Sequence, residues 1–165
     1  MTRPAIDVIE NALIAMIQDD ASYLTYIPDN QVQSFEQGVD LQSMEIILTP
    51  PGVLVMYESG SYAPLDINRS SYSIDERFTL IAVASNLRGM AEAKLGSGTE
   101  KGVYDILEDL KRLVVHNRRL AISASTDVTL IFLSVMPFEN LFYRTGFAAY
   151  GLQIKVQSSS WEYRS

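Results

Sequence analysis

The sequence predicts an α+β fold in which helices pack on one face of a mixed, largely antiparallel sheet. Apolar residues between positions 100 and 116 recur at helical spacing, which indicates an amphipathic helix. Apolar and polar residues alternate between 147 and 158, as in an antiparallel strand with one face on the core. The elements follow in the order helix, strands, helices, strands, which is typical of α+β proteins. A chain of 165 residues has the usual size of one domain, so we expect a single domain over 1–165.

Three helices are predicted. The first covers about residues 6–19, where apolar residues again follow helical spacing. A shorter helix is expected over 87–95. The main helix runs from about 100 to 116, with Thr99 as its N-cap. Its acidic residues come early and its basic residues late, in agreement with the helix dipole.

Five strands are predicted before the alternating C-terminal one, at residues 31–37, 44–48, 53–57, 72–85 and 128–136. The strand at 72–85 is apolar on both faces, so we expect it in the centre of the sheet. Residues 58–71 are rich in Gly, Ser, Asn and Asp and predict a long loop between two strands. Residues 159–165 are expected to form a short C-terminal tail.

The composition excludes several kinds of chemistry. The chain has no cysteine, which excludes disulfides, thiolate nucleophiles and cysteine-bound metals. Its single histidine, His116, leaves little room for a histidine-built metal site or a catalytic triad. Motifs for nucleotide binding, zinc hydrolysis, calcium binding and serine hydrolysis are absent. We therefore expect no catalytic residue, no cofactor and no metal, and an enzyme with a pocket outside these motifs stays as an alternative.

The charge is distributed unevenly along the chain. The net charge of −7 argues against a DNA-coating role, and no sequence-specific nucleic-acid partner is expected. Residues 1–68 contain ten acids and one base (−9), and residues 69–165 contain ten acids and twelve bases (+2). Such asymmetry favours a surface of two signs that steers association. The N-terminal apolar stretch is interrupted by Asp7 and Glu10, so we expect a cytoplasmic protein without membrane contact.

Aromatic residues and arginines at two places are the best candidates for a protein interface, because these residue types dominate binding energy at interfaces. One group lies in and beside the expected loop and the other in the expected tail. The candidate residues are Tyr62, Asp66, Arg69, Tyr72, Arg88, Trp161 and Tyr163. An equally good interpretation is that the aromatic residues cover the edge of the protein's own core.

Two segments resemble a known family. They are Asn86–Leu87–Arg88–Gly89–Met90–Ala91–Glu92–Ala93 and Glu100–Lys101–Gly102–Val103–Tyr104–Asp105–Ile106–Leu107–Glu108–Asp109–Leu110. A strand ending near an arginine, a glycine-containing gap and a Glu-x-Gly-x-Tyr-x-Leu-Leu-Glu-Asp helix are the pattern of small tail-completion proteins of Mu-like phages and prophages with contractile tails. The opening helix, the strand at 51–55 and the long final strand also agree with this family.

The resemblance implies a structural virion protein with a tail terminator-like fold, a mixed sheet flanked by helices. Terminators assemble as rings, commonly hexamers, on the end of the tail tube. The implied partners are other copies of the chain, the tube and sheath proteins, and the head–tail connector. The implied location is the virion, with the host cytoplasm during assembly. A head–tail connector or another minor tail protein is the alternative within phage particles, and a small α/β enzyme is the alternative of another class.

Overall fold

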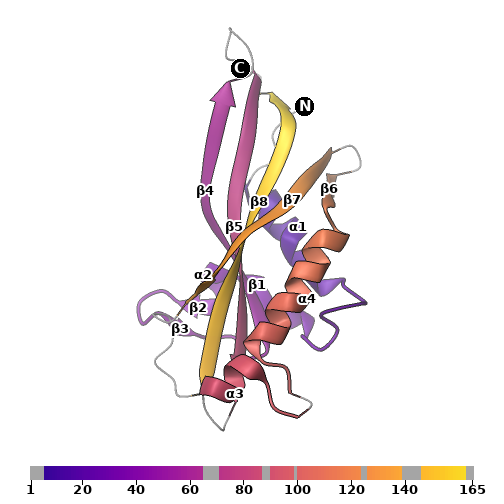
Figure 1. The fold of residues 1–165 in the computed structure, drawn as a ribbon. Coiled ribbons are helices and arrows are strands. Elements are labelled where there is room, and N and C mark those ends of the chain that lie inside the picture. Colours follow the sequence, from indigo (N-terminus) through magenta and orange to yellow (C-terminus); the bar gives the residue numbers. More distant parts are fainter. Residues whose placement is uncertain are drawn as a thin grey trace.

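Figure 1 shows the computed structural model of the chain, which describes residues 6–64, 71–86, 90–98, 100–123, 126–138 and 146–162. Its main element is a six-stranded sheet of order β1-β4-β5-β8-β7-β6. The strands are β1 (Val32–Ser34), β4 (Gly52–Pro64), β5 (Ser71–Ser85), β6 (Arg119–Ser123), β7 (Thr126–Pro137) and β8 (Phe147–Glu162). β1 and β4 run parallel, and the other neighbouring pairs of this sheet run antiparallel. The predicted mixed, largely antiparallel sheet is confirmed.

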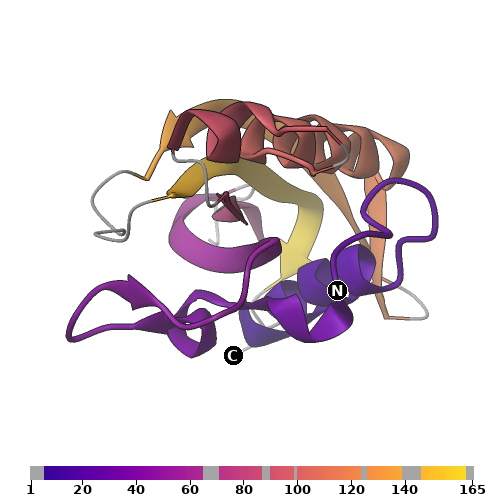
Figure 2. The same ribbon diagram turned by 90° about the horizontal axis from the view of Figure 1, so that it is seen from below.

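The larger hydrophobic core lies between one face of this sheet and three helices. These are α1 (Ile6–Gln18), α3 (Met90–Leu95) and α4 (Val103–His116). α4 buries the predicted apolar stripe against the sheet, and α1 buries Ile9, Leu13 and Ile17 in the same core. Seen from below, the sheet is curled, and α1 and α4 lie at separate places along the curl (Figure 2). The prediction of an α+β fold is confirmed.

A smaller core covers one end of the opposite face. It is formed by α2 (Phe35–Gly38) and a two-stranded sheet of β2 (Val39–Asp40) and β3 (Glu45–Ile46), which follow the short helix η1 (Asp29–Gln31) and β1. The predicted strand at 31–37 is therefore β1 followed by a helical turn, and the one at 44–48 is only two residues long. As predicted, β5 is buried on both faces: Phe78 and Leu80 belong to the larger core, and Ile81 to the smaller one.

The predictions of a loop at 58–71 and a tail at 159–165 are wrong for most of these residues. β4 continues through Pro64 and β5 begins at Ser71, so only 65–70 separate them in sequence, and these lie outside the described residues. β8 likewise continues to Glu162. Most residues of these strand ends are small or polar, so the sequence shows no apolar alternation there. Main-chain pairing with the neighbouring strand holds them in the sheet instead.

Two further details differ from the sequence prediction. α4 begins at Val103 with Gly102 as its N-cap, three residues later than predicted, and Thr99 lies outside the described residues. β6 was not predicted at all. It has five residues of mixed polarity between α4 and β7, and two exposed arginines, Arg118 and Arg119, stand at its start. Their basic charge is equally typical of the end of a helix, so it does not indicate a strand.

Candidate functional site

Three strands extend beyond the helices and form a projection that we call the arm. It consists of residues 58–64 of β4, 71–77 of β5 and 155–162 of β8. Figure 1 shows these strand ends rising above α1 and α4. β-Bulges lie at its base between Tyr57 and Ser59 and near its end between Tyr72 and Ile74. Bulges bend strands and strengthen their twist, so the arm is turned relative to the rest of the sheet.

The arm contains several of the predicted interface residues. Tyr62 is 45% exposed, whereas Tyr72 is half-buried and packs against the larger core. The backbone of Trp161 pairs with Tyr72, so these two residues lie side by side on neighbouring strands. The side chain of Trp161 lies outside the described residues, as do Asp66, Arg69, Arg88 and Tyr163. Tyr62 is thus accessible at the surface, and Tyr72 covers an edge of the core.

A buried carboxylate stands at the base of the arm. Glu76 is 0% exposed and accepts hydrogen bonds from the hydroxyl groups of Tyr57 (2.8 Å) and Tyr62 (3.3 Å). Gly60 lies beneath it, and a Cβ atom there would come within 2.4 Å of Glu76 Oε2. Adjacent carboxylates such as Asp75 and Glu76 usually lie in solvent, but Glu76 is fully buried. The carboxylate fixes both tyrosines relative to β5, which stiffens the arm where it leaves the core.

The opposite face of the sheet carries a polar strip across four strands. The Glu58 carboxylate accepts hydrogen bonds from Thr79 Oγ1 and Gln153 Nε2, and Ser134 Oγ donates to Gln153 Oε1 over 3.2 Å. Farther along the arm, Lys155 Nζ lies 3.9 Å from Asp75 Oδ2. These contacts link β4, β5, β8 and β7 side by side, so the strip stiffens the sheet where the smaller core no longer covers it.

The outer edge of β7 is apolar and exposed. β6 pairs with β7 from Thr126 as far as Thr129. No strand of the described chain pairs with the outer side of β7 over residues 131–137, which we call the β7 edge. Four large apolar residues there are 38–44% exposed, namely Ile131, Phe132, Leu133 and Val135. The sequence does not predict this feature, because an apolar segment has the same pattern in a buried strand and in an exposed edge strand. An exposed apolar strand edge is a template for pairing with another chain.

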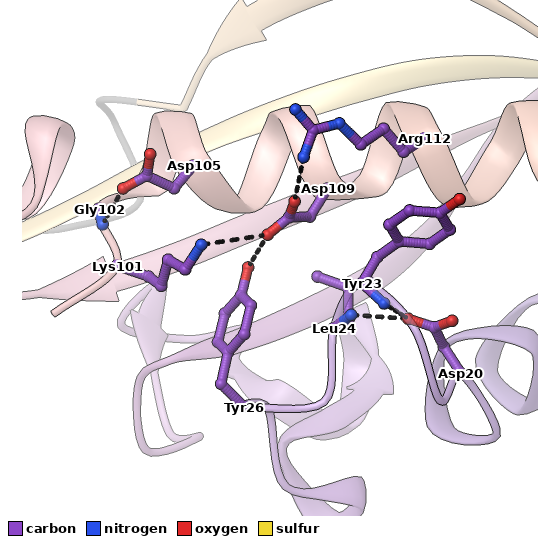
Figure 3. A network of polar contacts seen from close by, with 9 residues as sticks. All are labelled: Asp20, Tyr23, Leu24, Tyr26, Lys101, Gly102, Asp105, Asp109 and Arg112. Carbon is purple, nitrogen blue, oxygen red and sulfur yellow. Dashed lines mark hydrogen bonds and ion pairs between the residues drawn. The ribbon is translucent and has the colours of Figure 1, made fainter. Parts of the chain in front are cut away.

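A polar network on the helix side fixes the segment after α1 to α4 (Figure 3). The Tyr26 hydroxyl donates to Asp109 Oδ2 over 2.8 Å, and Arg112 Nη1 lies 3.2 Å from Asp109 Oδ1. Lys101 Nζ lies 3.8 Å from the same carboxylate and 5.3 Å from the centre of the Tyr26 ring. Asp20 accepts hydrogen bonds from the backbone N–H groups of residues 22, 23 and 24. The network fixes the segment after α1 against α4, and the carboxylates of Asp20 and Asp109 are both engaged in these contacts.

The segments that carry the family resemblance form the junction of α3 and α4. A Cβ atom at Gly102 would come within 2.2 Å of the Gly96 backbone nitrogen, so only glycine fits there. The Gly102 N–H donates to Asp105 Oδ2 over 3.0 Å, which caps the helix. Asn86 Nδ2 donates to Glu100 Oε2 over 2.9 Å and joins the end of β5 to this junction. The described part of the motif therefore holds a tight connection between the two helices.

A hollow of about 740 Å³ lies between α1, the end of α4 and β6. Its titratable lining residues are Asp19, Asp20 and His116. Asp20 is already occupied by three backbone N–H groups. Among the described residues there is no group of three or more His, Cys, Asp or Glu side chains that could hold a metal ion. Ser22 adds a hydroxyl group to the lining of the hollow.

Comparison of the sequence with known protein families shows which family the chain is similar to. The family described as "Bacteriophage Mu, Gp37" matches residues 5–132, which is most of the chain. The chain belongs to the bacteriophage Mu Gp37 family. This membership confirms the resemblance to Mu-like phage proteins and makes the chain a phage structural protein associated with the virion. No curated protein matches this Gp37 family member. Among the described residues, no helix is long and apolar enough to cross a membrane.

Proposed function

We propose that this Gp37 family member is a tail-completion protein of the terminator type. It assembles as a ring on the end of the tail tube, stops the growth of tube and sheath, and offers a docking surface to the head. The observation that carries the proposal is the β7 edge on a member of a phage structural family. A protein that works alone covers such an edge, whereas a ring subunit uses it for contact with a neighbour.

The arrangement of charge supports a ring rather than a two-fold pair. The acidic first part of the chain supplies β1, α2 and β4 on one side of the sheet, and the later part supplies β6 and β7 on the other. The two edges of the sheet therefore come from parts of the chain with different net charge, while α1 contacts β1, β4 and β6 alike. A closed ring needs two different surfaces that meet at each contact, whereas a two-fold dimer repeats one surface.

The proposed partners are other copies of the chain, the tube and sheath proteins and the head–tail connector. The proposed place of action is the virion, after assembly in the host cytoplasm. No catalytic step is part of the proposal, because its family is a structural one and the motif residues at the α3–α4 junction hold the backbone. A head–tail connector is the competing function within the particle.

Electron microscopy of tails made with and without this protein tests the proposal. Tails of uncontrolled length in its absence would support termination. Tails of normal length that fail to join heads would support a connector instead. Light scattering of the purified chain, alone and with tail tubes, gives the second readout. Ring-sized particles agree with termination, whereas a chain that stays monomeric in both samples contradicts it and favours the small-enzyme alternative.

A further inference from the structure

We propose that neighbouring copies of this chain join by strand addition, with the β7 edge of one copy pairing antiparallel with the arm portion of β4 in the next. The inference rests on the proposed ring and specifies its subunit contact. Its occupant is a second copy of the same chain. Four observations carry it: the two edges, their directions, their offset and the charges of the two sides.

The sheet has two open edge segments, one on each side. On the β7 side, β6 covers residues up to Thr129, and the Leu130 N–H still donates to Arg118. On the β4 side, β1 pairs only with Val53–Val55, and beyond Val55 no described strand pairs with the outer side of β4. Each edge strand of the sheet is thus covered over only part of its length, and the two uncovered segments are of similar length. Two different open edges on one subunit are what a head-to-tail contact requires.

The strand directions allow the contact without turning a subunit over. β4, β5, β8 and β7 are joined by three antiparallel pairings, so β4 and β7 run in opposite directions within one copy. A second copy in the same orientation therefore places its β4 antiparallel to β7 of the first. The antiparallel order then continues from copy to copy, and each contact adds main-chain hydrogen bonds between the strands.

The register determines how far the copies are offset along the strands. Within one copy, Phe132 is level with Ile154, Phe78 and Tyr57. Without an offset, the end of the β7 edge would occupy the position that β1 takes beside Val55. An odd shift would turn the side chains to the wrong faces. The smallest even shift that clears β1 is about four residues, or about 13 Å along the strand.

This shift matches particular residues across the contact. It places Phe132 opposite Tyr62 of the next copy, on the same face, as an aromatic pair across antiparallel strands. These two side chains are 44% and 45% exposed in the single chain. On the other face, Ser134 comes opposite Ser61. β4 of the next copy then ends, at Pro64, beside the point where β6 of the first copy begins to cover β7. β1 of the next copy and β6 of the first copy therefore limit the contact at its two ends.

The offset is also compatible with closure. Four strands per copy at about 4.8 Å spacing give a width of about 19 Å, and an offset of about 13 Å over this width corresponds to a strand tilt of about 35°. Sheets that close on themselves tilt their strands by about 35–45°. A continuous sheet passing through the copies can therefore return to its start as a ring.

The charges of the two sides disfavour the symmetric alternatives. The β4 side carries α2 with Glu36, and burial, then Glu36 and Asp7, raise the pKa of Glu10 on α1, which contacts β1, β4 and β6. Pairing of two β4 sides would bring two such acidic regions together. Pairing of β4 with β7 brings the acidic side to one with exposed Arg118 and Arg119 near its edge. Opposite charge favours the head-to-tail arrangement over like-with-like contact.

Disulfide trapping tests the contact, because the chain has no cysteine of its own. The variant carries Ser61→Cys and Ser134→Cys, both at exposed positions. Within one copy, two strands separate the two positions, so their Cα atoms are more than about 14 Å apart, beyond the reach of a disulfide. The matched control carries Ser85→Cys and Ser134→Cys, with Ser85 exposed at the far end of β5. Both variants are oxidised on purified tails and as the isolated full chain.

The expected result is a ladder of covalent multimers for S61C/S134C that contains more than half of the protein and collapses to one band on reduction. The control should stay more than nine-tenths monomeric. Several copies per tail without a ladder would overturn strand addition while leaving the ring intact. A two-copy particle by light scattering would overturn the head-to-tail arrangement. Cross-links to a different tail protein would assign the β7 edge to that protein. A single copy per tail would refute the ring itself, and the inference with it.

Discussion

The Tyr26 hydroxyl lies 2.8 Å from Asp109 Oδ2, although the two residues are 83 positions apart in the sequence. The bond joins the segment after α1 to the buried side of α4. Tyr26→Phe keeps the ring and removes the donor, while Arg112 and Lys101 still face the carboxylate. We therefore expect the free energy of unfolding to fall by about 1–2 kcal/mol, measured by urea denaturation.

Tyr104→Phe is the matched control. In the wild-type chain the Tyr104 hydroxyl lies 3.3 Å from the Tyr150 hydroxyl at an exposed position. Removing it should therefore lower the free energy of unfolding by less than about 0.5 kcal/mol. Equal losses in the two variants would mean that the bond between Tyr26 and Asp109 adds nothing beyond a surface contact.

The same bond predicts how stability depends on pH. Burial raises the pKa of Tyr26, and the hydrogen bond to Asp109 raises it further. In the unfolded chain a tyrosine ionises near pH 10, so above this pH ionisation stabilises only the unfolded state. Stability should therefore be fully present below about pH 10 and fall as the pH rises past it. The advantage of the wild-type chain over Tyr26→Phe should shrink between about pH 9 and 11 in urea denaturation, and a constant difference would contradict this cause.

Acidic crowding near β1 predicts a substitution that stabilises the protein. Burial raises the pKa of Glu10, and Glu36 and Asp7 raise it further. A carboxyl whose folded pKa lies above its unfolded value opposes folding once it is ionised, so the cost appears as the pH rises above about 4. Glu10→Gln should raise the free energy of unfolding by roughly 0.5 kcal/mol at pH 7. The gain should vanish near pH 3 and shrink in high salt.

Glu108→Gln provides a contrast of opposite sign. The hydrogen bond from Lys111, and then its charge, lower the pKa of Glu108, so this carboxylate favours the folded state when it is ionised. The substitution should reduce stability at pH 7, and the difference should be lost as the pH falls through the folded pKa. If both glutamine variants shifted the melting temperature in the same direction, charge would not be the cause.

The sequence predicted those helices and strands in which burial of one face makes apolar residues recur at a regular spacing. The stripe of α4 and the alternation in β8 follow directly from one buried face. The arm was missed because residues such as Ser59, Gly60 and Ser61 pair through the main chain and leave no apolar pattern. The bond between Tyr26 and Asp109 could not be predicted, because it depends on where the segment after α1 lies against α4. The aromatic residues of the sequence pointed to Tyr62, which is exposed, but gave no sign of the β7 edge.

The α3–α4 junction predicts a large effect from a single methyl group. At Gly102 a Cβ atom would come within 2.2 Å of the Gly96 nitrogen and 2.4 Å of the Lys94 carbonyl oxygen. Both are backbone atoms, so relief requires the helices to separate. Gly102→Ala should therefore cost about 3 kcal/mol or more, or prevent folding. Circular dichroism and urea denaturation measure the effect.

Gly98→Ala separates this steric effect from a loss of glycine as such. Gly98 has a φ of +59°, and a Cβ atom there would have no heavy atom of the described chain within 4 Å, so alanine meets only backbone strain. We expect a cost of about 1 kcal/mol. A Gly98→Ala variant as unstable as Gly102→Ala would show that the close approach of the backbone at Gly102 is not the reason for its glycine.

The β7 edge gives the prediction most directly tied to function. Phe132→Lys places a charge in the proposed subunit contact, where the neighbouring copy would have to bury it, so assembly should be lost. Because Phe132 is 44% exposed in the single chain, the melting temperature should change by only a few degrees. Tails assembled with this variant should show uncontrolled length in electron microscopy.

Val115→Lys, at a 60% exposed position on α4, is the control and should leave both assembly and tail length unchanged. If Phe132→Lys still formed ring-sized particles and tails of normal length, the β7 edge would not be the subunit contact. If it remained folded and monomeric while tails kept their normal length, termination itself would have to be assigned to another protein.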